Sequence, residues 1–315
     1  MIKKIAVLGA GTMGHGIAEA FAMNGYQVNL YEPFEQKRLV VKDEIRQELD
    51  LLVSEQFIPA GRRQEALDRI VLFDDLQAAV SDRDFVIEAA PEVLKLKQET
   101  FKTLDGLCPA GTILASNTSS LPLNEMMALL SEGRKARTMV CHWYNPAHLM
   151  PIVELSHFGN MPEAIYQDVA SLFQTIGKQT VKVLKDVPGL VANRIQQGVA
   201  REVFSIIEQG IAEPEDVDKA LKFGPAFRYA TTGQLEVADF GGLDIWCVVG
   251  DNLLKVMDNT QGANPLLRQK VAEGKLGLKS GEGFFPYEKD KISEIKNKFN
   301  KKLIHQLKAS SYYIV

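Results

Sequence analysis

Residues 5–23 read IAVLGAGTMGHGIAEAFAM, and this stretch joins an apolar strand, a glycine-rich turn and an apolar helix. The glycines follow the spacing GxGxxG directly after the strand. The first glycine permits a tight turn, the second lets a pyrophosphate approach the backbone, and the third lets the helix pack closely on the strand. The amino terminus of the helix then faces the phosphates. We predict that a dinucleotide is bound by the loop of Gly9, Gly11, Thr12, Met13 and Gly14.

A second strand is predicted at Gln27–Tyr31, and Glu32 follows it. Glu32 lies about twenty residues past the glycines, where a carboxylate can accept hydrogen bonds from an adenosine ribose. The same carboxylate would repel a 2′-phosphate, so the sequence favours NAD over NADP as the cofactor. The alternative is that the glycine-rich turn and a solvated Glu32 have no role in binding. That alternative would not require the observed order of strand, glycines and helix, or the spacing from the glycines to Glu32.

Short apolar runs alternate largely with helical patterns in the first part of the chain. A long charged helix near Phe34–Gln56 and a shorter helix after it form a helical hairpin inserted into this alternation. The pattern predicts an α/β fold with a Rossmann-type doubly wound, mainly parallel sheet, in which ligands bind at the carboxyl ends of the strands. The later strands are expected at Ile70–Phe73, Phe85–Glu88, Thr112–Ala115, Thr138–His142, Ile152–Leu155 and Thr180–Leu184.

Strand patterns end near Asp186, and helical periodicity takes over. We therefore predict an NAD-binding Rossmann domain over 1–186, a smaller all-α substrate and dimerisation domain over 187–287, and a basic helical extension over 288–315. The helices of the second domain are expected at Asn193–Gln209, Pro214–Phe223 and Gln234–Met257.

The first of these helices has a broad apolar face that includes Ile195, Val199 and Val203. A small helical domain with such a face commonly buries it against a second copy, so we expect a homodimer. Packing of this face within the same chain is the alternative.

The chain has 315 residues, of which 46% are hydrophobic, and a formal net charge of −4. This length can bury a large core, while the acidic balance disfavours nucleic acid and anionic membranes as partners. No stretch approaches the length of a membrane span, so we expect a cytoplasmic protein with a small-molecule substrate. The three cysteines are widely spaced with no CxxC, so they indicate neither disulfides nor a zinc site, and we expect no metal. Cys108, Cys141 and Cys247 are expected as free core thiols.

The segment MVCHWYNPAHLMPIVEL, residues 139–155, places His142 and Glu154 on two short strands joined by a turn-prone stretch. An antiparallel return of the chain would bring the two side chains together. A carboxylate that accepts from one ring nitrogen fixes the tautomer, so that the other nitrogen can take a hydroxyl proton. An incidental His–Glu pair is the alternative, but the nucleotide site in the same chain favours a catalytic base.

Six blocks of the chain, in order, resemble the 3-hydroxyacyl-CoA dehydrogenase family, and the resemblance extends nearly to Tyr287. The resemblance implies an NAD-dependent oxidoreductase acting on a CH–OH group, with a place in fatty acid metabolism. The blocks are VLGAGTMGHGIA, VIEAAPEVLKLKQE, ASNTSSL, HWYNPAHLMPIVE, DVPGLVANR and KLGLKSGEGFF.

The resemblance implies that His142 is the base, that Glu154 orients it, and that Ser119 and Asn193 bind the reacting oxygen. Ser119 could instead cap a helix that begins near Pro122, and Asn193 could form a hydrogen bond inside its own helix. In addition to the glycine loop, contacts with NAD are implied at Glu32, Ala90, Glu92, Lys97, Asn117, Asn145 and Lys279.

Two departures put CoA in doubt as part of the substrate. Family members that use CoA thioesters grip the CoA nucleotide with a Ser and a Lys in the helical hairpin, whereas an alignment without gaps puts Glu48 and Glu55 there. Carboxylates at these positions would repel phosphates. In the helical domain, Arg228 beside Tyr229 resembles the L-gulonate and L-carnitine dehydrogenases, which oxidise CoA-free hydroxy acids.

The planar guanidinium of Arg228 could bind a substrate carboxylate, and a structural salt bridge is the alternative. The segment EVADFGGLDIW that follows looks like the acyl-CoA branch. The sequence therefore predicts an NAD-dependent L-3-hydroxyacyl dehydrogenase acting on a 3-hydroxyacyl-CoA or a short 3-hydroxy acid. The alternatives are a CoA-free 3-hydroxy acid dehydrogenase and, from another class, a non-catalytic NAD-binding or structural protein.

Overall fold

The structure is a computed structural model that describes residues Ile2–Tyr312. The chain forms two compact units. The first contains Met1–Val191 and Leu303–Leu307, and the second contains Ala192–Lys302 and Lys308–Val315. Within the described range, no helix combines the length and the apolar character needed to cross a bilayer.

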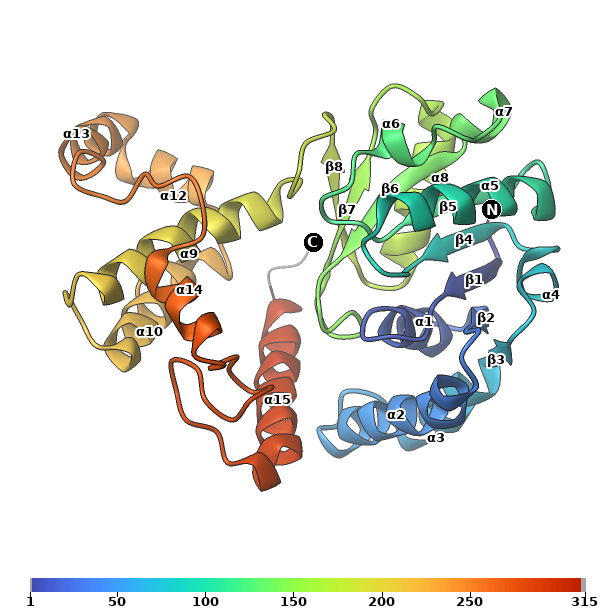
Figure 1. Ribbon diagram of the computed structural model, residues 1–315, viewed down its shortest axis with the longest axis horizontal. Coiled ribbons are helices and arrows are strands. Elements are labelled where there is room, and N and C mark those ends of the chain that lie inside the picture. Colours follow the sequence, from blue (N-terminus) through green and yellow to red (C-terminus); the bar gives the residue numbers. More distant parts are fainter. Residues whose placement is uncertain (1, 313–315) are drawn as a thin grey trace. The chain divides into compact units, whose positions relative to one another are not determined.

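The first unit is built on an eight-stranded sheet in the order β3-β2-β1-β4-β5-β6-β7-β8 (Figure 1). Neighbouring strands are parallel except for β6 and β7, which are antiparallel. This arrangement confirms the predicted doubly wound, mainly parallel sheet. The strands are β1 (Lys4–Leu8), β2 (Gln27–Tyr31), β3 (Ile70–Phe73), β4 (Phe85–Glu88), β5 (Ile113–Ser116), β6 (Thr138–Trp143), β7 (Ile152–Ser156) and β8 (Gln179–Val183).

Apolar cores cover both faces of the sheet. Along β1, Ile5 and Val7 belong to one buried cluster while Ala6 and Leu8 belong to the other, because successive side chains of a strand point to opposite faces. The helices of this unit are α1 (Gly14–Met23), α2 (Glu35–Ser54), α3 (Ala60–Arg69), α4 (Leu76–Val80), α5 (Leu94–Leu107), α6 (Leu123–Met126), α7 (Glu132–Lys135) and α8 (Glu163–Thr175).

Helices α2 and α3 form the predicted hairpin between β2 and β3. The long helix α2 buries only Val41, Ile45, Leu49 and Leu52, which are three or four residues apart and so lie on one face. The rest of α2 is mostly polar, although Leu39 and Val40 are exposed near its start.

The second unit is helical, as predicted. The expected helix Gln234–Met257 is wrong as a single element, because Gly242 adopts φ +89° and divides it into α12 and α13. A left-handed backbone at this position ends the first helix. The helices are α9 (Ala192–Glu208), α10 (Pro214–Phe223), α11 (Pro225–Tyr229), α12 (Gln234–Gly241), α13 (Leu243–Leu253), α14 (Pro265–Ala272), a 3-10 turn η1 (Lys289–Lys291) and α15 (Ile292–Ser310).

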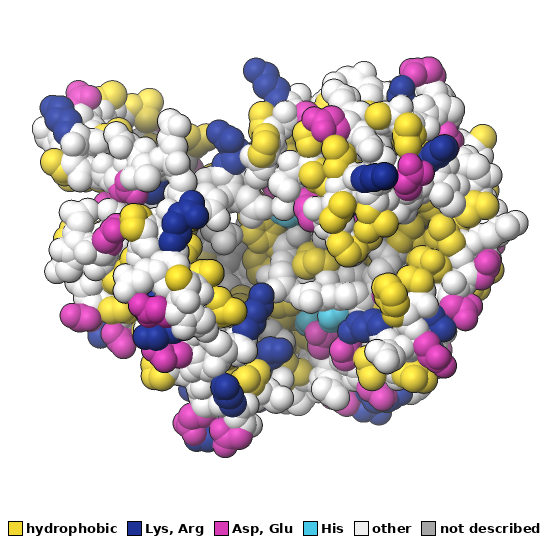
Figure 2. Space-filling view, in the orientation of Figure 1, with side chains coloured by type: hydrophobic (Ala, Val, Ile, Leu, Met, Phe, Trp, Pro, Cys, Tyr) yellow, Lys and Arg dark blue, Asp and Glu magenta, His cyan; other side chains and the backbone are white. Residues whose placement is uncertain are grey.

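Helix α13 exposes an unusual amount of apolar surface. None of its residues is buried, and Ile245, Val248 and Leu253 are each more than half exposed. Yellow hydrophobic side chains are visible over α13 in Figure 2. The expectation of three core thiols is wrong for Cys247, which lies exposed on this helix, whereas Cys108 and Cys141 are buried and free.

The end of α15 packs into the core of the first unit. Ile304 is fully buried in the same apolar cluster as Trp143 and the buried face of α2, and Leu303 packs against that cluster. His305 Nε2 lies 3.2 Å from Glu55 Oε2, just after the end of α2. The basic extension expected over 288–315 therefore contributes Leu303–Leu307 to the first unit.

Ile304→Ala should destabilise the first unit by about 2–5 kcal/mol, because it removes a fully buried side chain and leaves a cavity. The measurement is urea unfolding followed by fluorescence in a W246F background, so that Trp143, the other of two tryptophans, reports on this core. Phe299→Ala on the same helix is the control, since Phe299 is 53% exposed. Equal losses for the two variants would contradict the packing.

Candidate active site

The glycine loop has the geometry that a dinucleotide needs. Gly9 adopts φ +93°, and a Cβ on Gly14 would lie 1.7 Å from the Gly9 carbonyl oxygen, so helix α1 can follow β1 this closely only with glycine. A Cβ on Gly11 would meet nothing within 4 Å. The loop is therefore tight on its protein side and open at Gly11, where a pyrophosphate would approach.

Glu32 lies at the carboxyl end of β2, next to this loop. Its carboxylate accepts hydrogen bonds from the backbone N–H of Ala10, at 2.9 Å, and of Phe34, at 3.0 Å. Its side chain is thus held in one orientation beside the glycine turn, where the ribose of a dinucleotide would lie. The residues of this loop fit the predicted cofactor.

Glu88, at the end of β4, is the centre of a buried polar network. Lys97 Nζ donates to both of its carboxylate oxygens, at 2.8 and 2.9 Å, and Ser116 Oγ donates at 2.8 Å. Lys97 is only 1% exposed, and its ammonium also lies 3.3 Å from Glu92 Oε2. A direct contact between Lys97 and a cofactor would require it to leave these acceptors.

Glu92 organises the polar segment that follows β5. Its Oε1 accepts from the hydroxyls of Thr118 and Ser120 and from the backbone N–H of Ser119. Burial opposes ionisation of Glu92, but these hydrogen bonds and the charge of Lys97 outweigh it and lower the pKa of the carboxyl. Glu92 therefore stays ionised and holds this segment in place.

His142 and Glu154 lie directly opposite each other on β6 and β7. His142 Nδ1 is 2.8 Å from Glu154 Oε2, and Glu154 Oε1 accepts from the backbone N–H of Val191 at 2.8 Å. Glu154 is fully buried and His142 is 6% exposed. A carboxylate accepts hydrogen bonds, so Nδ1 carries the proton that is donated to Glu154, which leaves Nε2 as the ring nitrogen that can accept a proton.

Two further side chains hold this pair. Asn117 Oδ1 accepts from the backbone N–H of Trp143 at 2.8 Å, which ties the end of β5 to the end of β6. The Tyr144 ring lies edge-on to His142 with 5.3 Å between centroids. Burial, with the nearby Glu154 charge, raises the pKa of Tyr144 to about 12.

The sequence interpretation missed Tyr144 and Val191. Tyr144 stands two residues after His142, and the period-two alternation of a strand could have placed it on the same face. The Val191 N–H carried no signal, because a backbone group can be assigned only once the chain path is known.

The remaining predicted residues are divided between the two units. The backbone carbonyl of Ser119 accepts a hydrogen bond from the N–H of Gly189. At the amino terminus of α6, the N–H of Leu123 donates to Asp186 Oδ2 and not to Ser119, so the capping alternative for Ser119 is wrong. Ala90 is half-buried and Asn145 is exposed, both in the first unit. The second unit contains Asn193 near the start of α9, Arg228 on α11 and Lys279.

The two glutamates of the hairpin are not free surface carboxylates. Glu48 faces His15 and His148, with 3.2 Å from Oε1 to His15 Nε2, and Glu55 faces His305. Neighbouring histidines engage both carboxylates, and the repulsion of CoA phosphates by Glu48 and Glu55 stays a prediction.

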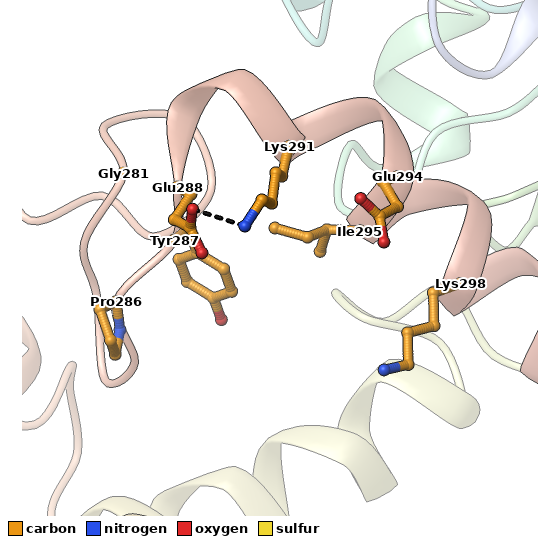
Figure 3. Close-up of a pocket in the computed structure, with 8 residues that line it drawn as sticks. All are labelled: Gly281, Pro286, Tyr287, Glu288, Lys291, Glu294, Ile295 and Lys298. Atoms are coloured by element: carbon orange, nitrogen blue, oxygen red, sulfur yellow. Dashed lines mark ion pairs between the residues drawn. The ribbon is translucent and has the colours of Figure 1, made fainter.

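A cavity of about 380 Å³ occurs in the second unit (Figure 3). Lys291 Nζ is 2.7 Å from Glu288 Oε2 at its edge. None of the predicted site residues lines this cavity, so it is separate from the predicted chemistry. Its lining consists of Gly281, Pro286, Tyr287, Glu288, Lys291, Glu294, Ile295 and Lys298.

Comparison with known proteins gives two family matches in sequence order. Residues 4–187 match the model for "3-hydroxyacyl-CoA dehydrogenase, NAD binding domain", and residues 189–287 match the "3-hydroxyacyl-CoA dehydrogenase, C-terminal domain". The chain is 36% identical to a probable 3-hydroxybutyryl-CoA dehydrogenase of Bacillus subtilis, over 91% of this chain and 98% of the relative.

A second relative is the 5-formyl-3-hydroxy-2-methylpyridine 4-carboxylate 5-dehydrogenase of Mesorhizobium japonicum, with 32% identity over 96% of this chain and 97% of the relative. A crystal structure of an enzyme of this name, described as an NAD+-dependent dismutase, has a TM-score of 0.87 and 32% identity over 97% of both chains. The (S)-3-hydroxybutyryl-CoA dehydrogenase from Ralstonia eutropha has a TM-score of 0.72 and 31% identity over 91% of this chain and 100% of the other.

The nucleotide loop, the sheet order and both family matches agree on an NAD-dependent oxidoreductase of the type that acts on CH–OH groups. The chain belongs to the 3-hydroxyacyl-CoA dehydrogenase family.

Proposed function

We propose that this enzyme interconverts a hydroxyl and a carbonyl group on a small hydroxy acid that carries no CoA, with His142 as the base. The observation that carries the catalytic part is the 2.8 Å contact between His142 Nδ1 and the buried Glu154 carboxylate. Such a pair is built for proton transfer at the free ring nitrogen.

In the oxidation direction, His142 Nε2 takes the hydroxyl proton while Nδ1–H continues to donate to Glu154. The carboxylate stabilises the imidazolium that forms, and the Val191 N–H keeps that carboxylate in position. The glycine loop and Glu32 would hold NAD+, which would supply the acceptor for the hydride that leaves the carbinol carbon. In the reduction direction, the protonated His142 returns the proton to the carbonyl oxygen.

Ser119 and Asn193 are proposed to donate hydrogen bonds to the reacting oxygen, in keeping with the family resemblance. Donors aimed at a developing oxyanion contribute about 10²–10³-fold to the rate of other enzymes. NAD is proposed to contact the glycine loop and Glu32, with Ala90, Glu92, Asn117, Asn145 and Lys279 completing the cofactor site. Lys97 is proposed to act through Glu88 and Glu92, because its ammonium is already bound to both.

The packing of the carboxyl-terminal helix supports a substrate without CoA. In this chain Leu303–Leu307 lie in the first unit, and His305 is paired with Glu55 at the hairpin position where the resemblance places a CoA-gripping residue. That surface of the hairpin is already covered by protein. A CoA nucleotide would have to displace this segment, including the fully buried Ile304.

Similarity to the Mesorhizobium japonicum enzyme points the same way. Its alignment covers 96% of this chain and so includes most of the extension after Tyr287, whereas the alignment to the probable 3-hydroxybutyryl-CoA dehydrogenase covers 91%. Its name describes a free pyridine carboxylate with no CoA. By analogy, the exposed Arg228 on α11 is proposed to bind a substrate carboxylate in this enzyme. The proposal sets aside a role in fatty acid metabolism.

We further propose that residues 1–186 bind NAD and that residues 187–287 complete the substrate site and form a homodimer. The apolar surface of α13 supports this assembly, because so many exposed apolar residues on one helix indicate a protein interface. The proposed location of the enzyme is the cytoplasm, on the basis of its composition.

His142→Gln should lower kcat by about 10²–10⁴-fold and change the Kd for NADH by less than about twofold, because the base is lost and the nucleotide loop is intact. Stopped-flow turnover and NADH fluorescence titration measure the two effects. His157→Gln is the matched control, since His157 pairs with the exposed Glu163, and it should retain activity. Persistent turnover in His142→Gln would reject this base.

A substrate panel followed by NADH absorbance should give kcat/KM at least about tenfold higher for a free acid than for acetoacetyl-CoA, a difference of about 1.4 kcal/mol. The panel contains free 3-hydroxy and 3-keto acids and the pyridine aldehyde carboxylate beside the thioester. Arg228→Gln should lower kcat/KM for the free acids only. A preference for acetoacetyl-CoA would overturn the CoA-free assignment and leave the base assignment standing.

Light scattering after size exclusion should give about twice the chain mass of 35.0 kDa. Val248→Asp should shift the protein toward monomer, because it places a charge in the proposed apolar interface. Leu96→Asp on α5, 42% exposed in the first unit, is the control and should remain dimeric. A monomeric wild-type protein would contradict the assembly.

A further inference from the structure

A second cluster of ionisable side chains lies behind the glycine loop, apart from His142 and Glu154. It contains Glu19 from α1, Glu48 from α2 and His148 from the connection between β6 and β7. One ligand atom from each of these residues lies within 4.8 Å of the other two. Glu19 is fully buried, and His148 is 6% exposed.

Three of the four carboxylate oxygens in this cluster lack a hydrogen-bond donor in the part of the chain that the structure describes. Neither oxygen of Glu19 nor Oε2 of Glu48 accepts a hydrogen bond from any group in Ile2–Tyr312. Buried polar atoms are nearly always hydrogen-bonded, and each exception requires an explanation such as an ion. Glu19 Oε2 and Glu48 Oε2 both lie near His148 Nδ1, so the unsatisfied acceptors are close together.

The nearest cations are already engaged elsewhere. Lys178 Nζ donates to the carbonyls of Ala147, at 2.8 Å, and Met150, at 2.7 Å. His15 Nδ1 donates to the Gly11 carbonyl at 2.7 Å, and its Nε2 lies against Glu48 Oε1 and not against the unpaired Oε2. Among the residues that the structure describes, Glu19 therefore has no counter-charge in hydrogen-bond contact, and it faces the carboxyl group of Glu48.

The spacing of the three ligand atoms suits a metal ion. His148 Nδ1 is 3.7 Å from Glu19 Oε2 and 3.8 Å from Glu48 Oε2. A cation about 2.1 Å from each of three ligands in one plane requires about 3.6 Å between ligands. Burial lowers the pKa of His148 to about 4, so its imidazole is neutral and able to coordinate.

We propose that Glu19, Glu48 and His148 form a binding site for one divalent transition metal of the Zn²⁺ type. One imidazole and two carboxylates match the ligands that such metals accept, and a purely oxygen-ligated ion such as Mg²⁺ is disfavoured. His15 holds the outer oxygen of Glu48, which is the usual arrangement around a metal-bound carboxylate. The site would join α1, α2 and the β6–β7 connection.

Metal binding is expected to release protons here. Burial, together with the neighbouring Glu48, raises the pKa of Glu19 well above its ordinary value, which favours the protonated carboxyl when no cation is bound. Burial also lowers the pKa of Lys178 to about 7, so this lysine can lose its charge when a cation enters. Displacement of these protons offsets the positive charge that the ion brings.

The test uses the untagged full-length chain, stripped with a chelator and titrated with Zn²⁺ or Co²⁺. Calorimetry in two buffers of different ionisation enthalpy should show one ion bound per chain with proton release, and Co²⁺ should give a visible absorption band. Glu19→Gln should weaken binding by more than about 100-fold, since even outer partners of metal ligands contribute 10–100-fold. Zn²⁺ should raise the melting temperature of the wild type and leave that of Glu19→Gln unchanged.

Glu44→Gln is the matched control, because Glu44 lies one turn away on α2 and is paired with Lys37 on the surface. It should bind the metal as the wild type does. Absence of stoichiometric binding by the wild type, or equal affinity in Glu19→Gln, would overturn the site. Suppose that the wild type binds no metal and that metal-free Glu19→Gln has the higher melting temperature of the two. Glu19 would then be a buried protonated acid instead of a metal ligand.

Discussion

The antiparallel pairing of β6 with β7 is the interaction on which the proposed catalytic pair depends. In a sheet that is otherwise parallel, this reversal sets His142 directly opposite Glu154. Cross-strand neighbours have adjacent side chains, so the register alone brings the imidazole to the carboxylate. The buried Glu154 is then stabilised at both oxygens, by His142 and by the Val191 N–H, which offsets the cost of removing its charge from water.

The parallel part of the sheet supplies the cofactor side in the same way. Parallel strands end at one edge, so the polar residues after β2, β4 and β5 gather there. Glu32, Glu88 and Glu92 are each held by several hydrogen bonds from the backbone or from neighbouring side chains. These hydrogen bonds fix the orientation of the three carboxylates without a ligand, and a preorganised site loses less entropy on binding.

Two parts of the molecule contrast with this satisfied network. Glu19 and Glu48 have buried oxygens without partners, and α13 has apolar side chains without cover. Both are unfavourable in an isolated chain, the first because of desolvation and the second because of exposed apolar area. An ion at the first and a second copy of the chain at the other would remove these costs.

The sequence by itself determined the fold class, the NAD loop and the pairing of His142 with Glu154, because glycine spacing, strand alternation and the residues between Thr138 and Leu155 are local signals. It did not determine the break at Gly242, which depends on a backbone conformation that glycine permits but does not impose. Nor could it place Glu48 and Glu55, whose histidine partners are up to 250 residues away in sequence. Only the tertiary structure brought Glu19 to His148 and His305 to Glu55, because contacts between distant segments depend on the packing of whole elements, and no local pattern encodes them.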